Sequence, residues 1–216
     1  MKRSMKGLLA LTVASAALAA PGAFAAEGPL MVRVRAVNLD MENKSDAIPA
    51  LAVPSDAIRA SDKTIPEVDI SYFIGRNIAA ELVLTVPQKH DVEVTQSAIG
   101  AFKAGTFKHL PPTLTLQYHF LPDGQFRPYV GAGVNYTRFS SVNLAVPGVT
   151  TLRLEKDSWG GALQAGFDVK LTDNLFLNLD VKKIYIKTDI KDDAGTVVSR
   201  LKADPLAIGV GLGWRF

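Results

Sequence analysis

The segment DPLAIGVGLGWRF, from Asp204 to Phe216, has an apolar side chain at every second position from Leu206 onward. The positions between them hold small residues and one arginine, Arg215. A period of two predicts a β-strand. An apolar face that ends in Trp-x-Phe is typical of a strand in an outer-membrane barrel, which turns its apolar face to lipid and its aromatic residues to the headgroups. A buried C-terminal strand of a soluble β-sandwich is the alternative.

The first 25 residues have the composition of a secretory signal peptide. Lys2, Arg3 and Lys6 precede an apolar stretch at positions 8–20, and Ala23-Phe24-Ala25 provides small residues before a cleavage point. The apolar stretch is shorter than the roughly 20 residues that a membrane-spanning helix needs. We therefore expect residues 1–25 to be removed and residues 26–216 to form one domain.

The composition of the remaining chain gives no support for a nucleic-acid-binding protein, a disulfide-rich protein or a thiol metal site. Lys and Arg total 24 against 21 Asp and Glu, and three of the basic residues lie in the predicted signal peptide, so the mature chain is close to neutral. A basic pI therefore gives no evidence for nucleic-acid binding. The chain has no cysteine, so it needs no disulfide and offers no thiol metal site. We expect no cofactor and no metal.

Alternation recurs in seven further segments, which gives eight predicted strands. The segments are 31–39, 66–74, 78–86, 113–120, 126–139, 158–171, 175–186 and the C-terminal stretch. Three connections are tight turns rich in Gly, Asn and Asp, at 75–77, 122–125 and 172–174. The other four, at 40–65, 87–112, 140–157 and 187–203, are long, and we interpret 187–202 as a solvated loop.

Strict alternation of short and long connections predicts an all-β fold, an eight-stranded antiparallel transmembrane β-barrel with short periplasmic turns and long outer loops. Both termini then lie on the periplasmic side. A soluble lipocalin-like barrel would instead place its apolar face inside. The aromatic residues favour the membrane barrel, because they share the apolar parity near the strand ends. They are Tyr72, Tyr118, Phe120, Phe126, Tyr136, Trp159, Phe167, Trp214 and Phe216.

The opposite face of each strand predicts the contents of the lumen. Near the periplasmic end it collects charged and polar side chains, which we expect to pair into a polar floor: Arg33, Glu81, His119, Arg127, Asp168, Lys170, Asp180 and Arg215. Near the outer end it collects apolar side chains, which predict a mouth that binds a small hydrophobic ligand: Val37, Leu39, Val83, Phe139, Ile184 and Ile186. Ordinary packing beneath the outer loops is the alternative for this second group.

Several stretches resemble the outer-membrane protein W (OmpW) family of eight-stranded barrels. They are HLPPTLTLQYHF (109–120), FRPYVGAGVNYT (126–137), KDSWGGALQAGFD (156–168), GRNIAAELV (75–83) and the GWRF ending. The resemblance implies a porin-like barrel of the Gram-negative outer membrane, with a hydrophobic interior that admits small apolar compounds and releases them through its wall. The loop segments at 50–53 and 144–146 depart most from the family.

We therefore expect a non-enzymatic barrel that binds or passes small hydrophobic molecules. Its expected partners are these solutes, outer-membrane lipids, lipopolysaccharide and the barrel-assembly machinery, which would read Phe216. A structural, adhesive or receptor barrel without solute transport is the first alternative. A lipid-modifying enzyme is the second, and it would need a catalytic histidine and serine such as His109 and Ser140 or Ser141. We interpret His109 as a solvated loop residue, since no motif orders these groups.

Overall fold

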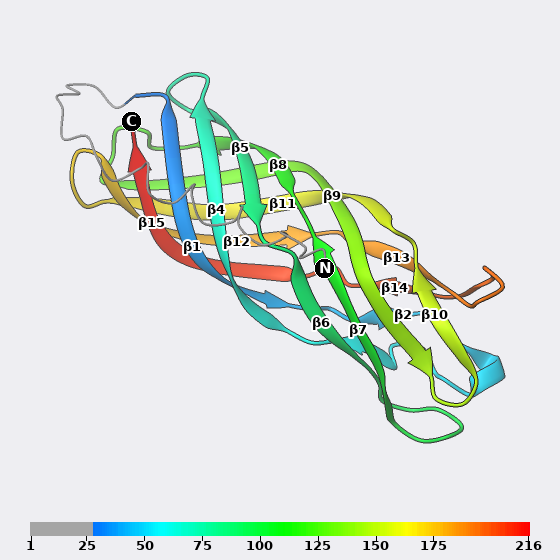
Figure 1. Ribbon diagram of the computed structural model, residues 1–216. Helices are drawn as coiled ribbons and strands as arrows, with labels where there is room; N and C mark the ends of the chain where they lie inside the picture. Colours follow the sequence, from blue (N-terminus) through cyan, green and yellow to red (C-terminus); the bar gives the residue numbers. More distant parts are fainter. Residues whose placement is uncertain (1–27) are drawn as a thin grey trace, which may run out of the picture.

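A computed structural model describes residues 28–216 (Figure 1). The predicted signal peptide lies outside the described residues. Eight long strands close into an antiparallel barrel in the order in which they follow one another, with β9 paired to β11. They are β1 (Leu30–Asp40), β4 (Lys63–Phe73), β5 (Ile78–Thr85), β8 (Thr113–His119), β9 (Phe126–Val146), β11 (Asp157–Lys170), β12 (Leu175–Ile184) and β15 (Leu206–Arg215). The eight predicted strands are confirmed.

The barrel turns its apolar side chains outward and encloses its charged ones. Leu116 and Val130 are 57% and 46% exposed, whereas Arg33 and Glu81 are fully buried. A soluble barrel would show the reverse distribution, so this arrangement suits a wall that faces hydrocarbon. No helix in the described part of the chain is long and apolar enough to cross a membrane.

Both ends of the described chain lie at the end of the barrel that carries the short turns (Figure 1). β1 pairs with β15 along its whole length, and the backbone N–H of Phe216 donates to the carbonyl of Leu30 at 2.8 Å. Tight turns join β4 to β5, β8 to β9 and β11 to β12. These turns and the placement of the termini agree with the prediction.

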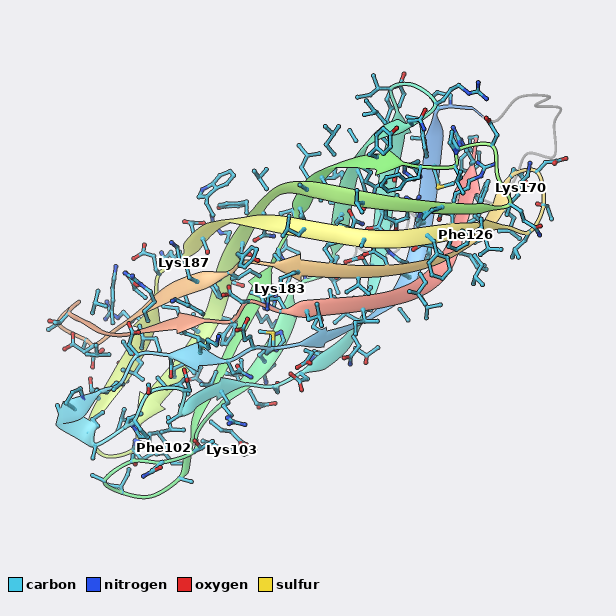
Figure 2. The ribbon with its side chains drawn as sticks, turned by 180° about the vertical axis from the view of Figure 1, so that it is seen from behind. Phe102, Lys103, Phe126, Lys170, Lys183 and Lys187 are labelled. Atoms are coloured by element: carbon cyan, nitrogen blue, oxygen red, sulfur yellow. The ribbon has the colours of Figure 1, made fainter. Side chains whose placement is uncertain are left out.

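The four long connections are more ordered than the sequence suggested. They contain a short 3-10 helix, Pro49–Leu51, and the additional strands β2 (Lys44–Ser45), β3 (Ile58–Ala60), β6 (Gln88–Val94), β7 (Phe102–Leu110), β10 (Thr150–Leu154), β13 (Lys187–Lys191) and β14 (Val197–Lys202). Together with the distal half of β9 they continue the wall beyond the barrel, and we call this region the outer extension (Figure 1). Figure 2 shows Phe126 and Lys170 at the short-turn end and Phe102 and Lys103 at the opposite tip.

Two sequence predictions are wrong in this region. Residues 187–202 form the β13–β14 hairpin, in which Ile190 and Leu201 are buried, so they are not a solvated loop. His109 lies within β7 and is 2% exposed, so it is not a solvated loop residue either. In both cases tertiary packing of the outer extension determines the structure, and the local sequence has too little contrast between its two faces to show it.

Candidate functional site

The lower lumen is closed by a network of buried charges around Arg33. Its Nε and Nη2 atoms donate to the two carboxylate oxygens of Asp168 at 3.1 and 2.7 Å. Its Nη1 atom donates to Ser71 Oγ at 2.7 Å and to Glu81 Oε2 at 2.9 Å. These partners come from β11, β4 and β5, so one guanidinium connects both sides of the barrel.

A second charged group surrounds Arg35, which is two residues above Arg33 and on the same face of β1. Arg35 Nη2 is 2.5 Å from Asp69 Oδ2 and 3.2 Å from Glu67 Oε1, and Nη1 is 3.3 Å from Asp180 Oδ1. Lys182 Nζ lies 3.4 Å from Glu67 and 3.7 Å from Asp180. Buried charges are tolerated only when they are paired, and these side chains meet that condition.

We call the buried ionic side chains of these two groups the ionic plug. Its members are Arg33, Arg35, Glu67, Asp69, Glu81, Asp168, Asp180 and Lys182. Gln164 connects the two groups, since its Nε2 atom donates to Glu81 at 2.8 Å and to Asp180 at 2.7 Å. Its Oε1 atom accepts from Thr115 at 3.0 Å and from Gln117 at 3.2 Å. The lumen at this level is therefore filled by protein side chains.

The remaining residues of the predicted floor lie nearer the short-turn end. The His119 ring lies between Phe73 and Tyr129, with centroid distances of 4.9 and 5.0 Å. The Arg127 guanidinium lies 4.8 Å from the centre of the Phe176 ring, an ordinary cation–π distance. These groups form an aromatic layer below the ionic plug.

Two further predicted residues lie at the rim. The Arg215 guanidinium packs 3.9 Å from the centre of the Phe73 ring, and its Nε atom donates to the carbonyl of Gly28 at 2.8 Å. Lys170 Nζ is 3.3 Å from the exposed Asp173 carboxylate in the β11–β12 turn. Of the eight predicted floor residues, the ionic plug contains four, namely Arg33, Glu81, Asp168 and Asp180.

Important members of the ionic plug are missing from the predicted floor. Arg35, Asp69 and Lys182 are buried and central to it. The signal that could have found them was available, because they share the inward parity of Arg33, Ser71 and Asp180 on their own strands. The pairing partners could not be assigned, because they depend on the side chains of non-adjacent strands.

The six predicted mouth residues are all buried, but they do not form one group. Phe139, Ile184 and Ile186 belong to a large cluster that fills the outer extension. Val37 and Leu39 pack with Ile65 and Ala207 in a separate cluster. Val83 is 3% exposed and lies in neither cluster.

We call the large group the outer apolar cluster. Most strands of the outer extension contribute to it, with members that include Ile58, Val92, Phe107, Leu144, Ile190 and Leu201. Within it is an apolar cavity of about 30 Å³, lined by residues such as Val53, Val94 and Leu152. This space is about the volume of one water molecule, so the cluster is packed rather than open.

Two histidines lie at the base of the outer apolar cluster. The rings of His90 and His109 stack with centroids 4.8 Å apart, and both also pack against Phe107. His90 Nδ1 donates to the carbonyl of Ser61 at 2.6 Å. Burial, opposed by this hydrogen bond, lowers the pKa of His90. Burial and, to a smaller extent, the neighbouring His90 lower the pKa of His109 to about 3.

Metal-ligating groups do not gather anywhere in residues 28–216. No set of three or more His, Cys, Asp or Glu side chains in this region is arranged to hold a metal ion. The charged residues of the lumen are therefore best described by their mutual pairing.

The OmpW family pattern matches residues 26–216, almost the whole chain. The chain belongs to the OmpW family. Outer membrane protein W of Vibrio cholerae is 32% identical over 225 residues, which span the full length of both proteins. The dibenzothiophene metabolism operon protein PahQ of Pseudomonas aeruginosa is 28% identical over 92% of this chain and 93% of its own.

A solved structure gives the same result for the fold. The crystal structure of the outer membrane protein OprG from Pseudomonas aeruginosa superposes with a TM-score of 0.74 at 29% identity, and the match covers 88% of this chain and 96% of OprG. This OmpW family member is therefore an outer-membrane β-barrel, as its lipid-compatible exterior indicates.

Proposed function

We propose that this barrel binds small hydrophobic molecules at its outer end and passes them into the outer membrane. The observation that carries the proposal is the outer apolar cluster, which lies directly above the ionic plug. Transfer of an apolar solute from water into the cluster lowers its free energy. Transfer into the ionic plug would be unfavourable, because the solute would disturb paired charges without replacing their interactions. The relative PahQ, named for the metabolism of a fused aromatic heterocycle, supports a hydrophobic solute.

The ionic plug opposes passage of an apolar solute along the barrel axis, so we infer that the solute leaves the outer apolar cluster sideways through the wall. Above Glu67 and Thr85 the ladder between β4 and β5 ends, and residues 63–66 pair only with β1. Side chains cross this interruption instead, with Thr85 Oγ1 donating to the Pro66 carbonyl and Lys63 Nζ to the Lys89 carbonyl, each at 2.9 Å. We infer that a solute leaves here, because separation breaks no continuous backbone ladder.

The test uses uptake of dibenzothiophene by proteoliposomes that contain the mature barrel. Val83→Asp and Ile184→Asp each place a carboxylate in the proposed path, so uptake should fall at least fivefold. Ile184→Trp should also slow uptake, because it fills the path without adding charge. Val149→Asp is the matched control, since Val149 is exposed in the β9–β10 turn and should have no effect.

Folding of each variant is checked by its heat-modifiable mobility in gels. Normal uptake by folded Val83→Asp and Ile184→Trp proteins would reject the proposed path.

A structural or receptor barrel is the second candidate, and the closed packing of the lumen favours it. The cavity of about 30 Å³ is too small for a fused-ring solute, so passage requires the outer apolar cluster to open. The second candidate predicts that shortening the β9–β10 or β13–β14 hairpin abolishes function, whereas lumen substitutions do not. The uptake series therefore separates the two candidates.

A further inference from the structure

Three lysines stand in line across neighbouring strands of the outer extension. Lys187 on β13 lies directly opposite Lys202 on β14, and Lys202 lies directly opposite Lys44 on β2. All three side chains are exposed. Like charges placed directly opposite one another destabilise a sheet, so a row of this kind favours a bound counter-charge. We call these residues the lysine row.

The protein supplies little of that counter-charge. Glu42 is 2.6 Å from Lys44 Nζ and 2.6 Å from Lys183 Nζ, so two ammonium groups share it. No carboxylate of residues 28–216 lies within ion-pairing distance of Lys187 or Lys202. The Asp204 carboxylate, which lines the same surface groove as Lys187 and Lys202, accepts a hydrogen bond from the backbone N–H of Ile186 at 2.7 Å. Within the described part of the chain, neither Lys187 nor Lys202 thus forms a direct ion pair, and the Asp189 carboxylate, which acts on Lys187 electrostatically, is itself paired with Arg200 at 2.7 Å.

A groove of about 370 Å³ runs beside the row. Lys187 and Lys202 line one part of it, and the aromatic rings of Trp159 and Tyr185 line another. Trp159 is 69% exposed and Tyr185 is 44% exposed. Cationic and aromatic surfaces side by side suit a ligand that has both an anionic group and a hydrocarbon part.

The position of the groove on the barrel identifies the environment that it faces. Trp159, Tyr185 and Tyr136 lie where the exposed apolar wall ends, and this level corresponds to the headgroup region of the membrane. Lys187 follows Tyr185 by two residues on the same face, which places it about 5 Å farther from the hydrocarbon once the tilt of barrel strands is included. Figure 2 labels Lys187 and Lys183 on this part of the wall. The lysine row is therefore at the level of lipid phosphates in the outer leaflet.

We propose that the lysine row and its groove bind a phosphate group of lipopolysaccharide, with an acyl chain against Trp159 and Tyr185. Lysine ammonium groups near a membrane surface attract anionic headgroups, and two adjacent ones hold a doubly charged phosphate better than one. The proposal concerns the outside of the wall and is independent of the proposed solute path inside it.

The test measures binding of bisphosphorylated lipid A to the full mature barrel in a non-ionic detergent by native mass spectrometry. Lys187→Gln combined with Lys202→Gln should weaken binding at least tenfold. The matched control is Lys89→Gln combined with Lys108→Gln, a lysine pair that is also directly opposite across β6 and β7. We expect at most a threefold effect from the control, because it removes the same charge away from the groove.

A second readout uses the fluorescence of Trp159 in a Trp214→Phe background, which leaves one tryptophan among residues 28–216. Lipid A should shift its emission to shorter wavelength, and lipid A stripped of both phosphates should not. Equal loss in both lysine double variants would reject the groove as the site. Equal binding of phosphatidylglycerol, or displacement by millimolar inorganic phosphate, would reject lipopolysaccharide as the specific ligand.

Discussion

Arg33 illustrates how one side chain can join two halves of a lumen. It donates four hydrogen bonds to residues on three strands, and its side chain is fully buried. A buried guanidinium is costly unless its donors are satisfied, and the two carboxylates and Ser71 satisfy them. His90 and His109 show the opposite solution, because their burial favours the neutral ring over the charged one.

The histidine pair predicts a pH-dependent stability of the outer extension. The pKa of His109 is about 3 in the folded protein, against about 6.5 in an unfolded chain, so the unfolded state binds the proton first as pH falls. The stabilising contribution is complete above pH ~6.5 and is lost progressively below it. From His109 alone, the free energy of unfolding should fall by about 2 kcal/mol between pH 7.5 and 5.

The measurement is urea unfolding of the barrel in micelles at pH 7.5 and pH 5. The double variant His90→Phe with His109→Phe keeps the ring stack and removes both titrating groups, so its loss should be smaller by about this amount. Charged groups near His90 are Lys63, which lowers its pKa, and Asp62 and Asp91, which raise it. Identical losses in the two proteins would contradict the assignment.

At the scale of the element, β15 shows why a glycine face is needed beside β1. A methyl group on Gly211 would lie 2.0 Å from the Val34 carbonyl oxygen and 2.7 Å from the Arg35 Cα atom. At Gly213 the nearest atom would be Arg33 Cγ at 3.1 Å, part of a side chain that can adjust. The backbones of β1 and β15 therefore approach closely at Gly211 and leave more space at Gly213, the next inward position.

This difference predicts the order of two alanine variants. Gly211→Ala should reduce the free energy of unfolding by about 1–3 kcal/mol, because a backbone segment must move. Gly213→Ala should cost less than about 1 kcal/mol, since only a flexible side chain must shift. Gly75→Ala is the control without effect, because nothing lies within 4 Å of the added methyl. Unfolding in urea ranks the three, and a larger loss at Gly213 would overturn the argument.

Element by element, the sequence predicted the barrel strands better than the outer extension. β8 and β15 contrast apolar lipid-facing residues with small or polar inward ones, and that contrast makes the period visible. β13 and β14 face water outside and a mixed interior inside, so KTDIK and VVSRLK show little contrast. The strand that holds His109 ends at Pro111-Pro112, a dipeptide that suggested a loop. Parity placed Arg33 and Asp168 in the lumen, but their pairing needed the closed barrel.

The whole molecule has an interior that changes from apolar to ionic to aromatic along its axis. The outer apolar cluster is followed by the ionic plug and then by the layer around His119 and Phe176. The lumen at the plug is crossed by side chains from several strands, which Gln164 joins. Water-filled porins, by contrast, have many more strands and an open lumen.

This filled lumen predicts that the barrel does not conduct water-soluble molecules. Liposomes that contain the mature barrel should swell in an isotonic arabinose solution no faster than liposomes without protein, because the plug blocks the axis. A general porin serves as the positive control in the same assay. Swelling at porin-like rates would show that the plug is open in membranes.

The seam between β1 and β15 has a consequence for biogenesis. The strand synthesised first has the strand synthesised last as one of its two neighbours, and Arg33 on β1 reaches Asp168 on the far side of that junction. Until β15 has arrived, the guanidinium on one side and the carboxylate on the other have no closed lumen in which to meet. A nascent chain that lacks β15 therefore cannot form the ion pair between Arg33 and Asp168. Closure of the cylinder therefore completes the neutralisation of its interior, because Arg33 can pair with Glu81 before closure but with Asp168 only after it.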